Sequence, residues 1–388
     1  MVMAKAAASL ARDVHAQEEG ISEGYKQTEV GSIPDQWQVG YIEDFAVIAT
    51  GGRNTQDRVD DGQYPFFVRS QKVERINTYS FEGEAVLTAG DGVGTGKIFH
   101  YINGKCDIHQ RVYRISDFAE SVNGYYFFLY FSANFYDRIM QMTAKSSVDS
   151  VRREMIARMP IALPPKGEQD AIARAISDAE QLVERLETLI VKKRAIKRGA
   201  FQDLLTGKRR LPGFKEEWSE QALGTIAPLQ RGFDLPNSRL REGPYPVVYS
   251  NGIVNYHSQF QVKGPGVVTG RSGTIGAVTY VEGNYWPHNT TLWVTKFGQN
   301  DPRFVGFLYS WIGFERFASG SGVPTLNRND AHAFKVRIPP SSDEQKAIAG
   351  VLQDINADIS ELEKRLAKAQ QIKQGMMQQL LTGRVRMS

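Results

Sequence analysis

The sequence is poor in cysteine, in long apolar runs and in net charge, and the first two shortages each exclude a class of protein. Cys106 is the only cysteine among 388 residues, so neither an internal disulfide nor a cysteine-cluster metal site can form. No run of about 18 apolar residues is present, so no membrane span and no membrane partner are expected. The net charge of +4 is compatible with nucleic-acid binding without demanding it. The N-terminus lacks the apolar core and cleavage site of a signal peptide, and the single cysteine fits a reducing compartment, so we expect a cytoplasmic protein.

The sequence also lacks complete catalytic signatures. The stretch TAGDGVGTGK (88–97) resembles a phosphate-binding loop, whose template is G-x-x-x-x-G-K-[ST]. Asp91 stands where the first glycine should be, and Ile98 replaces the hydroxyl residue that should follow Lys97. The proline pairs read LPPK and IPPS, without the polar first residue of an [ND]-P-P-[YF] methyltransferase motif, and no paired-carboxylate nuclease signature is present. We therefore expect no catalytic residue and no metal site in this chain.

What the sequence does contain is a long internal repeat. Residues 167–210 recur as residues 343–386, with an offset of 176 and no gap. Each copy follows a proline pair and ends in the tetrapeptide LLTG. Two copies separated by so much other sequence indicate a duplicated two-part unit rather than a solenoid.

Each copy of the repeat predicts one helix of about 38 residues, roughly 57 Å long. Its apolar residues recur at spacings of three and four, which is typical of a coiled coil. A helix with one apolar stripe needs a partner, and the two helices would pair antiparallel, given how the chain connects them. The predicted seam residues are Ile172, Ile176, Val183, Leu186, Ile190, Ile196, Leu204, Ile348, Leu352, Ile355, Ile359, Leu362, Leu366, Ile372 and Leu380.

The two segments beside the repeats, 21–165 and 208–340, have similar patterns and divergent sequences. Both are rich in short β-like runs bounded by turn residues, and both end in an aromatic, helix-like piece. The stretch VLTAGDGVGTGK (86–97) aligns with VVTGRSGTIGAV (267–278), which keeps a glycine frame and loses the lysine. We therefore interpret both stretches as glycine-containing β-hairpins and not as nucleotide pockets.

These patterns predict an α+β fold with a pseudo-twofold internal repeat. Two mixed α/β domains are separated by two long helices that form an antiparallel coiled coil. The predicted boundaries are 1–20 for a leader or short helix, 21–165 for the first domain, 166–207 for the first long helix, 208–340 for the second domain and 341–388 for the second long helix.

Several motifs together resemble the specificity (S) subunit of type I restriction-modification systems, over roughly residues 21–388. They are YKQTEVGSIPDQW (25–37), a glycine hairpin in each half, LPPKGEQ and IPPSSDEQ before the helices, and LLTGKRRLPGF after the first helix. The resemblance implies a non-catalytic prokaryotic protein in which each domain is a target-recognition domain that reads one part of a bipartite DNA site. It also implies that the coiled coil sets the gap and docks two methyltransferase (M) subunits, which restriction (R) subunits then join. S-adenosylmethionine would be held by M, and ATP with Mg by R, so no cofactor is expected in this chain.

Loops rich in Arg, Lys, Asn, Gln, Ser and Thr supply the candidate DNA contacts, because these side chains suit phosphates and base edges. In the first domain the candidates are Arg53, Asn54, Gln56, Arg58, Arg69, Ser70, Gln71, Lys72, Lys97, His109, Gln110, Arg111, Lys145, Ser146 and Arg153. In the second domain they are Arg231, Ser250, Asn251, Arg271, Ser272, Thr274, His288, Asn289, Thr325, Asn327 and Arg328. For each of these the alternative is a solvated surface residue, and for the two histidines it is a structural role at a strand start.

Two other functions are alternatives to a recognition subunit, and the second is the weaker one. A duplicated protein-binding scaffold would have the repeat without affinity for DNA. A DNA modification enzyme would need the catalytic motifs that the sequence lacks. Binding of duplex DNA together with M subunits, and its dependence on salt, separates the recognition subunit from the scaffold.

Overall fold

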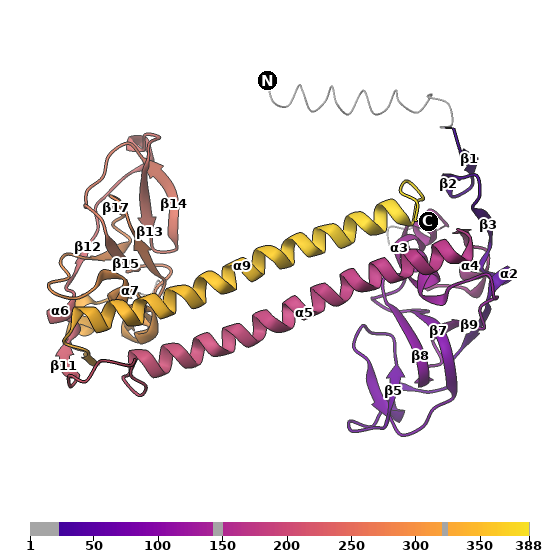
Figure 1. Ribbon diagram of the computed structural model, residues 1–388, viewed down its shortest axis with the longest axis horizontal. Coiled ribbons are helices and arrows are strands. Elements are labelled where there is room, and N and C mark those ends of the chain that lie inside the picture. The colour runs from indigo at the N-terminus through magenta and orange to yellow at the C-terminus, as the bar shows by residue number, and fades with distance from the viewer. Residues whose placement is uncertain (1–22, 143–149, 320–324, 388) are drawn as a thin grey trace. The chain divides into compact units, whose positions relative to one another are not determined.

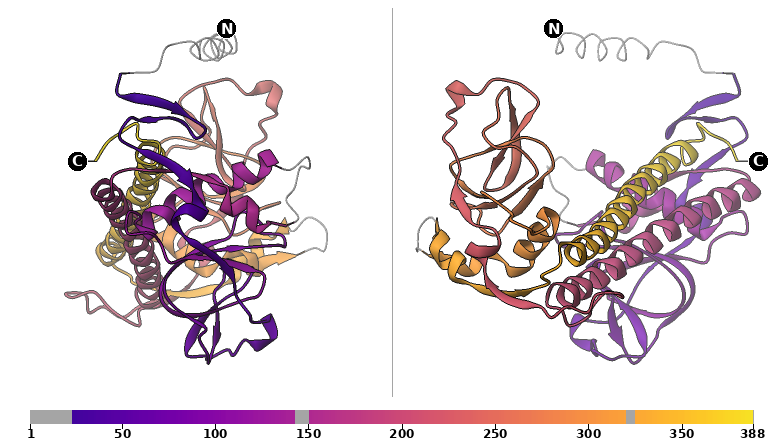
Figure 2. Two further views of the ribbon diagram at one scale, coloured as in Figure 1. Left: turned by 90° about the vertical axis from the view of Figure 1, so that its right-hand side faces the viewer. Right: turned by 60° about the vertical axis from the view of Figure 1, so that its left-hand side comes forward.

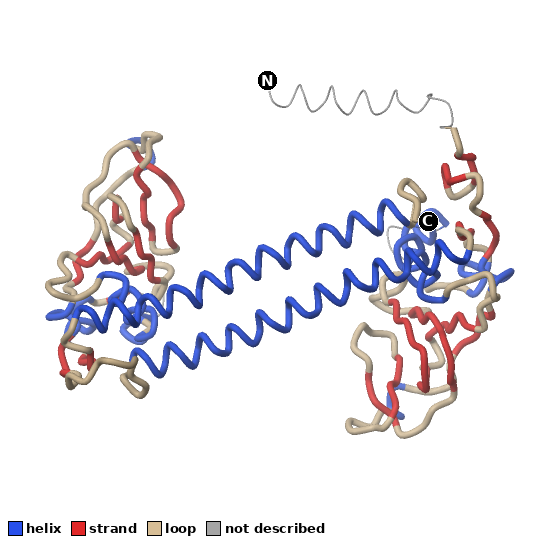
Figure 3. The backbone as a smooth tube through the Cα atoms, in the orientation of Figure 1, coloured by secondary structure: helices blue, strands red, loops and turns tan. Residues whose placement is uncertain are grey.

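The computed structural model describes residues 23–142, 150–319 and 325–387. The chain divides into two compact units, which are Met1–Glu184 with Ala367–Ser388 (unit 1) and Arg185–Leu366 (unit 2). Each unit combines a group of strands with shorter helices and a stretch of two long helices (Figure 3). The predicted α+β class is therefore confirmed. Among the described residues, no helix combines the length and the apolar character that crossing a membrane requires.

Unit 1 is built on a six-stranded sheet with the order β4-β9-β7-β8-β5-β6. All neighbours in it are antiparallel except β5 and β8, which are parallel. The strands are β4 (Val47–Thr50), β5 (Tyr64–Phe67), β6 (Glu74–Ile76), β7 (Phe81–Ala89), β8 (Phe99–Ile108) and β9 (Val112–Ser116). Strands β7 and β8 pair directly across the glycine-rich stretch, so the predicted hairpin is confirmed there.

One aromatic helix covers this sheet. Helix α3 (Gly124–Met142) packs against β7 and β8 (Figure 1). Phe127, Phe131 and Phe135 recur every four residues on its buried face, and their rings stack with centroids 5.8 and 4.5 Å apart. The helical spacing thus places three large rings in one row, which forms part of the core of unit 1.

Smaller elements complete unit 1. Strands β1 (Tyr25–Thr28) and β2 (Gly31–Pro34) form an antiparallel pair, and β3 (Gln38–Tyr41) pairs with β10 (Pro160–Leu163). Short helical turns are α2 (Ile42–Phe45), η2 (Thr55–Asp57) and α4 (Arg153–Ala157). The β3–β10 pair ends just before the first long helix and so joins the start of that helix to the domain.

Unit 2 contains a four-stranded sheet, β12-β18-β15-β16, and a three-stranded sheet, β14-β13-β17. The strands are β12 (Leu229–Arg231), β13 (Tyr245–Tyr249), β14 (Gly252–His257), β15 (Gly266–Gly270), β16 (Val278–Val281), β17 (Trp286–Pro287) and β18 (Thr291–Val294). Helix α7 (Pro302–Ile312) packs against β15 and β16, as α3 packs on β7 and β8 in unit 1. The second predicted hairpin, β15–β16, is confirmed as well.

The remaining elements of unit 2 are short strand pairs and short helices. Strand β11 (Ser219–Ala222) pairs with β21 (Lys335–Ile338), and β19 (Ala318–Ser319) pairs with β20 (Thr325–Leu326). The short helical elements are α6 (Leu223–Ile226), η3 (Asn237–Arg239), η4 (Phe314–Phe317) and α8 (Arg328–Ala333). The β11–β21 pair corresponds to β3–β10 of unit 1, because each leads directly into a long helix.

The two long helices are α5 (Lys166–Leu205) and α9 (Ser342–Leu380). Each is followed by a glycine with positive φ, Gly207 at 70° and Gly383 at 69°, which is the usual helix stop. Within each unit the stretches of α5 and α9 lie side by side in every view (Figures 1 and 2).

Ion pairs show the relative direction of the two helices inside each unit. In unit 1, Lys373 lies 2.8 Å from Glu180, and Arg386 lies 2.7 Å from Glu168. In unit 2, Lys193 lies 2.8 Å from Asp358, and the corresponding contact near the helix start joins Arg210 to Glu344 at 2.6 Å. Residue numbers rise on one helix as they fall on the other, so the stretches run antiparallel in both units.

The buried seam differs from the predicted one at two positions. Ile196 and Ile372 are 50% and 51% exposed, which contradicts their assignment to the seam. The half-buried Lys197 and Lys373 take the inner positions instead. The Nζ of Lys373 pairs with Glu180, and the Nζ of Lys197 lies 5.4 Å from the ring centroid of Phe201. Lysine can bury its aliphatic stem while its ammonium group reaches the surface. Apolar spacing alone therefore chose the neighbouring isoleucine at these two positions of the seam.

The remaining seam residues are buried or half-buried. Those that are at most 9% exposed are Ile172, Ile176, Leu186, Ile190, Leu204, Ile348, Leu352, Ile359, Leu362 and Leu380. Val183, Ile355 and Leu366 are half-buried. The largest burial lies at the helix ends, where the helices pack into the cores of their units.

A buried carboxylate fixes the start of each long helix. Glu168 accepts hydrogen bonds from Nε and Nη2 of Arg386 at 2.7 and 2.8 Å, and from Nε1 of Trp37 at 3.2 Å. Although desolvation acts to raise the pKa of Glu168, the Arg386 hydrogen bonds hold it below its ordinary value. Unit 2 repeats this arrangement with Glu344, Arg210 and Trp218.

The glutamine that follows connects each long helix to the aromatic helix of its unit. Gln169 accepts from the Asn123 N–H at 2.9 Å, and Gln345 accepts from the Asp301 N–H at 2.8 Å. Both amides also donate to the carbonyl of a preceding proline. The Glu-Gln pair near the start of each repeat is therefore an anchor between a long helix and its domain.

Candidate nucleic-acid interface

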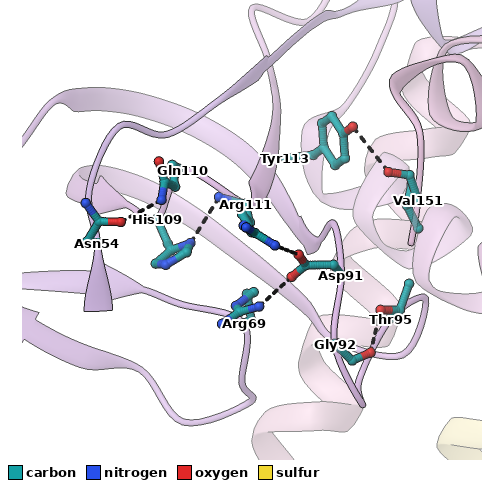
Figure 4. Close-up of polar contacts among 10 residues, drawn as sticks. All are labelled: Asn54, Arg69, Asp91, Gly92, Thr95, His109, Gln110, Arg111, Tyr113 and Val151. Carbon is teal, nitrogen blue, oxygen red and sulfur yellow. Dashed lines mark hydrogen bonds and ion pairs between the residues drawn. The ribbon is translucent and has the colours of Figure 1, made fainter. Parts of the chain in front are cut away.

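Four loops of unit 1 meet at one end of its sheet. They are residues 51–58, 67–72, 89–97 and 109–112. Backbone hydrogen bonds of 2.8–2.9 Å join them, from His109 to Phe67, from Gly90 to Arg111 and from Gln110 to Arg53. The loops therefore form one connected surface, which Figure 4 shows with its side chains.

A histidine shapes the middle of this surface. The Nδ1 of His109 accepts the backbone N–H of Arg111 at 3.0 Å, which closes a tight turn. The residue is 4% exposed. Burial lowers the pKa of His109 below that of a free histidine, and Arg69 acts in the same direction. The ring is therefore a neutral turn-forming group, which favours the structural role of the two considered from sequence.

A glycine brings the first loop close to that turn. A Cβ atom on Gly51 would lie 1.9 Å from the carbonyl oxygen of Ile108, closer than any real contact. The adjacent Arg53 donates from Nε to the buried Asp107 at 3.1 Å, and from Nη2 to Thr78 at 3.0 Å. Arg53 thus connects the first loop to Asp107 and Thr78 through its side chain.

Polar side chains project from this frame in two groups, and within each group the side chains form hydrogen bonds to one another (Figure 4). Gln110 donates from Nε2 to Oδ1 of Asn54 at 2.6 Å. Asp91 accepts from Nη1 of Arg69 at 2.7 Å and from Nη1 of Arg111 at 2.5 Å. Although desolvation acts to raise it, these bonds lower the pKa of Asp91 below its ordinary value.

Three other basic candidates of the first domain contact nearby side chains. Arg58 and Lys72 both approach Glu74, at 3.8 and 3.2 Å. The Nζ of Lys97 lies 4.6 Å from the ring centroid of Tyr136 on α3, so the lysine that suggested a phosphate loop is a cation–π partner.

The remaining first-domain candidates are placed separately. Gln56 and Gln71 are exposed, and Ser70 donates to the carbonyl of Lys72 at 2.8 Å. Arg153 is the exposed first residue of α4. Lys145, Ser146 and the N-terminal residues 1–20 lie outside the described residues.

Unit 2 repeats the backbone frame of these loops. The Nδ1 of His288 accepts the Thr290 N–H at 3.4 Å, in the same turn that His109 forms. Burial lowers the pKa of His288 as well, although Asp234 opposes this. A Cβ atom on Gly232 would lie 2.2 Å from the His288 carbonyl oxygen, so this glycine matches Gly51.

The side chains on the second frame are different. Asn289 donates from Nδ2 to Oδ1 of Asp234, which replaces the contact between Gln110 and Asn54. These two residues also line a pocket of about 480 Å³, together with Leu235, Pro236, Arg239 and His288. The same scaffold therefore presents a different chemical surface in each unit.

Backbone contacts give the correspondence for the charged group. The Gly90 N–H donates to the Arg111 carbonyl, and the Arg271 N–H donates to the Thr290 carbonyl, both at 2.8 Å. Single β-bridges join Asp91 to Ser150 and Ser272 to Thr325. The positions of Arg69, Asp91 and Arg111 are accordingly taken in unit 2 by Ser250, Ser272 and Thr290.

The other candidates of the second domain lie around this frame. Arg231, Asn251 and Thr274 are exposed, and Arg271 is half-buried. Asn327 caps α8 by accepting from the Asn329 N–H at 3.0 Å, and Arg328 is the first residue of that helix.

Two contacting residues, Asp234 and Thr290, were not among the predicted DNA contacts, whereas Asp91 is one of the variable hairpin positions that the sequence suggests could face DNA. Aligning the two halves loop by loop would have shown that each occupies a position equivalent to a polar candidate in the other half.

The described residues contain no group of three or more His, Cys, Asp or Glu side chains arranged to hold a metal ion. The chemistry available at both surfaces is hydrogen bonding and charge, supplied by arginine, amide, hydroxyl and carboxylate groups. Such groups can contact phosphates and base edges in a DNA groove.

Comparison with known proteins places the chain in a family. The profile of the type I restriction modification DNA specificity domain matches residues 34–192 and 215–374. The type I restriction enzyme EcoDI specificity subunit of Escherichia coli is 28% identical over 162 residues, which cover 42% of this chain and 33% of that subunit. The MjaVIII specificity subunit of Methanocaldococcus jannaschii is 21% identical, and the match covers 94% of this chain and 96% of that subunit.

A solved structure has the same fold. The crystal structure of a type I restriction-modification system S subunit from M. genitalium matches with a TM-score of 0.67 and 15% sequence identity. The match covers 93% of this chain and 98% of that one. Because the family profile matches each half of the sequence once, the chain belongs to the type I restriction-modification specificity subunit family.

Proposed function

We propose that this chain is the non-catalytic DNA-recognition subunit of a type I restriction-modification complex, and that each half reads one part of a bipartite site. The observation that carries this is the repeated loop frame, in which the same histidine turn and glycine contact hold different side chains. Sequence is read by side chains on base edges, so a shared frame with different side chains suits two different half-sites.

The proposal assigns residues 21–165 and 208–340 as target-recognition domains and the long helices as spacers. Antiparallel pairing of α5 and α9 within each unit supports an antiparallel coiled coil that sets the gap between half-sites. In this scheme the helices also dock two methyltransferase subunits, and restriction subunits join the complex. S-adenosylmethionine would be bound by the methyltransferase subunits, and ATP with Mg by the restriction subunits, and none by this chain.

The test is duplex DNA binding by the full chain with its methyltransferase subunits. We expect one bipartite sequence to be preferred, and we expect affinity to fall steeply with salt because phosphate contacts release counterions. Scrambling either half-site in the probe should weaken binding, whereas changing the bases between them should not. A complex that assembles but binds DNA with no salt dependence and no preference would favour a protein-binding scaffold instead.

A further inference from the structure

The two recognition surfaces differ most at one set of equivalent positions. In unit 1 this set is the arginine triad, which we define as Arg69, Asp91 and Arg111 (Figure 4). In unit 2 it consists of three hydroxyl residues, Ser250, Ser272 and Thr290. The scaffold is the same, so the difference concerns what each surface can bind.

The triad is anchored through Asp91, which is the least exposed of its three residues. Asp91 is only 20% exposed, whereas Arg69 and Arg111 are 40% and 61% exposed. The backbone of Arg111 accepts from the Gly90 N–H, and a Cβ atom on Gly90 would lie 2.9 Å from that same carbonyl oxygen. The carboxylate is therefore the inner member, and two guanidinium groups lie over it toward solvent.

Each guanidinium group keeps most of its hydrogen-bonding capacity. Among the described residues, Arg69 and Arg111 contact Asp91 through Nη1 alone, which leaves Nε–H and Nη2–H of each available. A planar guanidinium edge with two parallel donors fits the O6 and N7 acceptors of guanine in the major groove. No other base presents two acceptors at that edge.

The contacts with Asp91 also fix the orientation of the two arginine side chains. A carboxylate fixes the planes of both side chains before DNA arrives and so reduces the ordering cost on binding. It weakens contacts with phosphates, because its charge opposes theirs. A surface that served only to attract DNA would gain by lacking Asp91, so the triad suits reading bases better than holding the backbone.

We propose that Arg69 and Arg111 determine specificity for guanine in the first half-site, and that Asp91 is their positioning residue. This inference rests on the proposed function, since it names the base that unit 1 recognises. The hydroxyl set of unit 2 lacks the bidentate donors, so the second half-site is not read through guanine at the equivalent positions.

The experiment selects preferred duplexes from a random library with the full chain and its methyltransferase subunits. Arg111→Ala and Arg69→Ala should each reduce the preference for guanine at a position of the first half-site by roughly 10- to 100-fold. The second half-site should stay unchanged. Lys105→Ala is the matched control, because this basic residue of unit 1 pairs with Glu82 on β7, outside the loop cluster, and should alter neither half-site.

An atom-level probe identifies the contact. Replacing a first-half guanine with 7-deazaguanine removes N7, and should weaken binding of the unmodified complex while leaving one of the two arginine variants unaffected. If the first half-site contains no guanine, or if neither arginine variant changes base preference, the inference is overturned. Failure of the proposed function looks different, because the unmodified complex would then select no sequence at all.

Asp91→Asn separates positioning from folding. We expect weaker discrimination at guanine, together with tighter binding to unrelated DNA, because a negative charge has left the surface. A variant that weakens binding to all sequences equally and melts at a lower temperature would show that Asp91 only supports the loops, and would overturn the positioning role.

Discussion

At the scale of single residues, the loops separate two tasks that the sequence mixes together. Gly51 and His109 fix the backbone in unit 1, and Gly232 and His288 do so in unit 2. The residues between and beside them carry the varied chemistry. A frame that tolerates exchange of its side chains is what a protein needs in order to acquire new binding preferences without refolding.

The glycine contact gives the first prediction. In Gly51→Ala the new Cβ would meet the Ile108 carbonyl oxygen at 1.9 Å, so the loop must move. We expect a loss of roughly 1–3 kcal/mol in the free energy of unfolding of unit 1 and weaker discrimination in the first half-site. Gly52→Ala is the control, because nothing lies within 4 Å of its Cβ position. Equal melting temperatures for the two variants would refute the argument.

The histidine turns predict a pH dependence. Burial lowers the pKa of His109 and of His288, so in the folded chain both lose their protons at lower pH than in the unfolded chain, where the pKa is about 6.5. The unfolded state then binds more protons, so stability is fully present above pH 6.5 and falls as the pH drops through the lowered values. Asp57 and Asp91 oppose the shift at His109, and Arg69 supports it.

Thermal unfolding at pH 7.5 and 5.5 measures this effect. In a double variant, His109→Asn with His288→Asn, the asparagine oxygen can accept the same backbone N–H without titrating. We expect the variant to fold and to lose less stability on acidification than the unmodified chain. Because burial also lowers the pKa of His100 and His332, part of the dependence should remain. An unchanged pH dependence would contradict the assignment.

The sequence could predict the paired histidines, since both halves show one at the same place. It could not predict the contact of Asp91 with two arginines. That contact joins loops 20 and 22 residues apart, and it depends on how the strands between them pair. The glycine pattern around Asp91 therefore predicted the hairpin correctly. The contacts of Asp91 could not be predicted, because its two arginine partners lie on neighbouring loops.

At the scale of elements, the long helices were predictable because their signals are local. Proline before the first turn, periodic apolar residues and glycine after the last leucine all act within a few residues. The seam was less predictable, since it depends on the partner helix. Ile196 and Ile372 follow the apolar spacing but lie at the surface, because Lys197 and Lys373 occupy the inner positions.

This difference supplies a matched pair of double variants. Leu186 and Leu362 are 5% and 9% exposed, so replacing both with glutamate would bury two charges and should cost several kcal/mol. Ile196→Glu with Ile372→Glu should change stability little, because these side chains are half-exposed. Circular dichroism reports the loss of helix, and co-purification with methyltransferase subunits reports the loss of the proposed docking. Intact assembly of the leucine variant would contradict the coiled-coil proposal.

At the scale of the whole molecule, the duplication reaches beyond the fold to individual contacts. The buried glutamate of each long helix binds an arginine that follows the LLTG end of the other copy. The C-terminal Arg386 thus does for Glu168 in unit 1 what the internal Arg210 does for Glu344 in unit 2. The same contact is therefore made in both units, by an arginine that follows α9 in unit 1 and by an arginine that follows α5 in unit 2.

Because the contacts repeat, the domains should be exchangeable. Replacing residues 211–340 with the equivalent domain of another specificity subunit leaves Arg210, Glu344 and both long helices in place. The exchange removes Trp218, so the incoming domain must supply a tryptophan there to donate to Glu344.

Sequencing of methylated adenines in cells that express the chimera with the methyltransferase subunits reads the outcome. We expect one half of the methylated site to change, while the other half and the gap stay the same, because in the proposed function each half-site is read by one loop frame and the helices set the spacing. A change in both halves would mean that the two units read the site jointly, and independent half-site recognition would have to be abandoned.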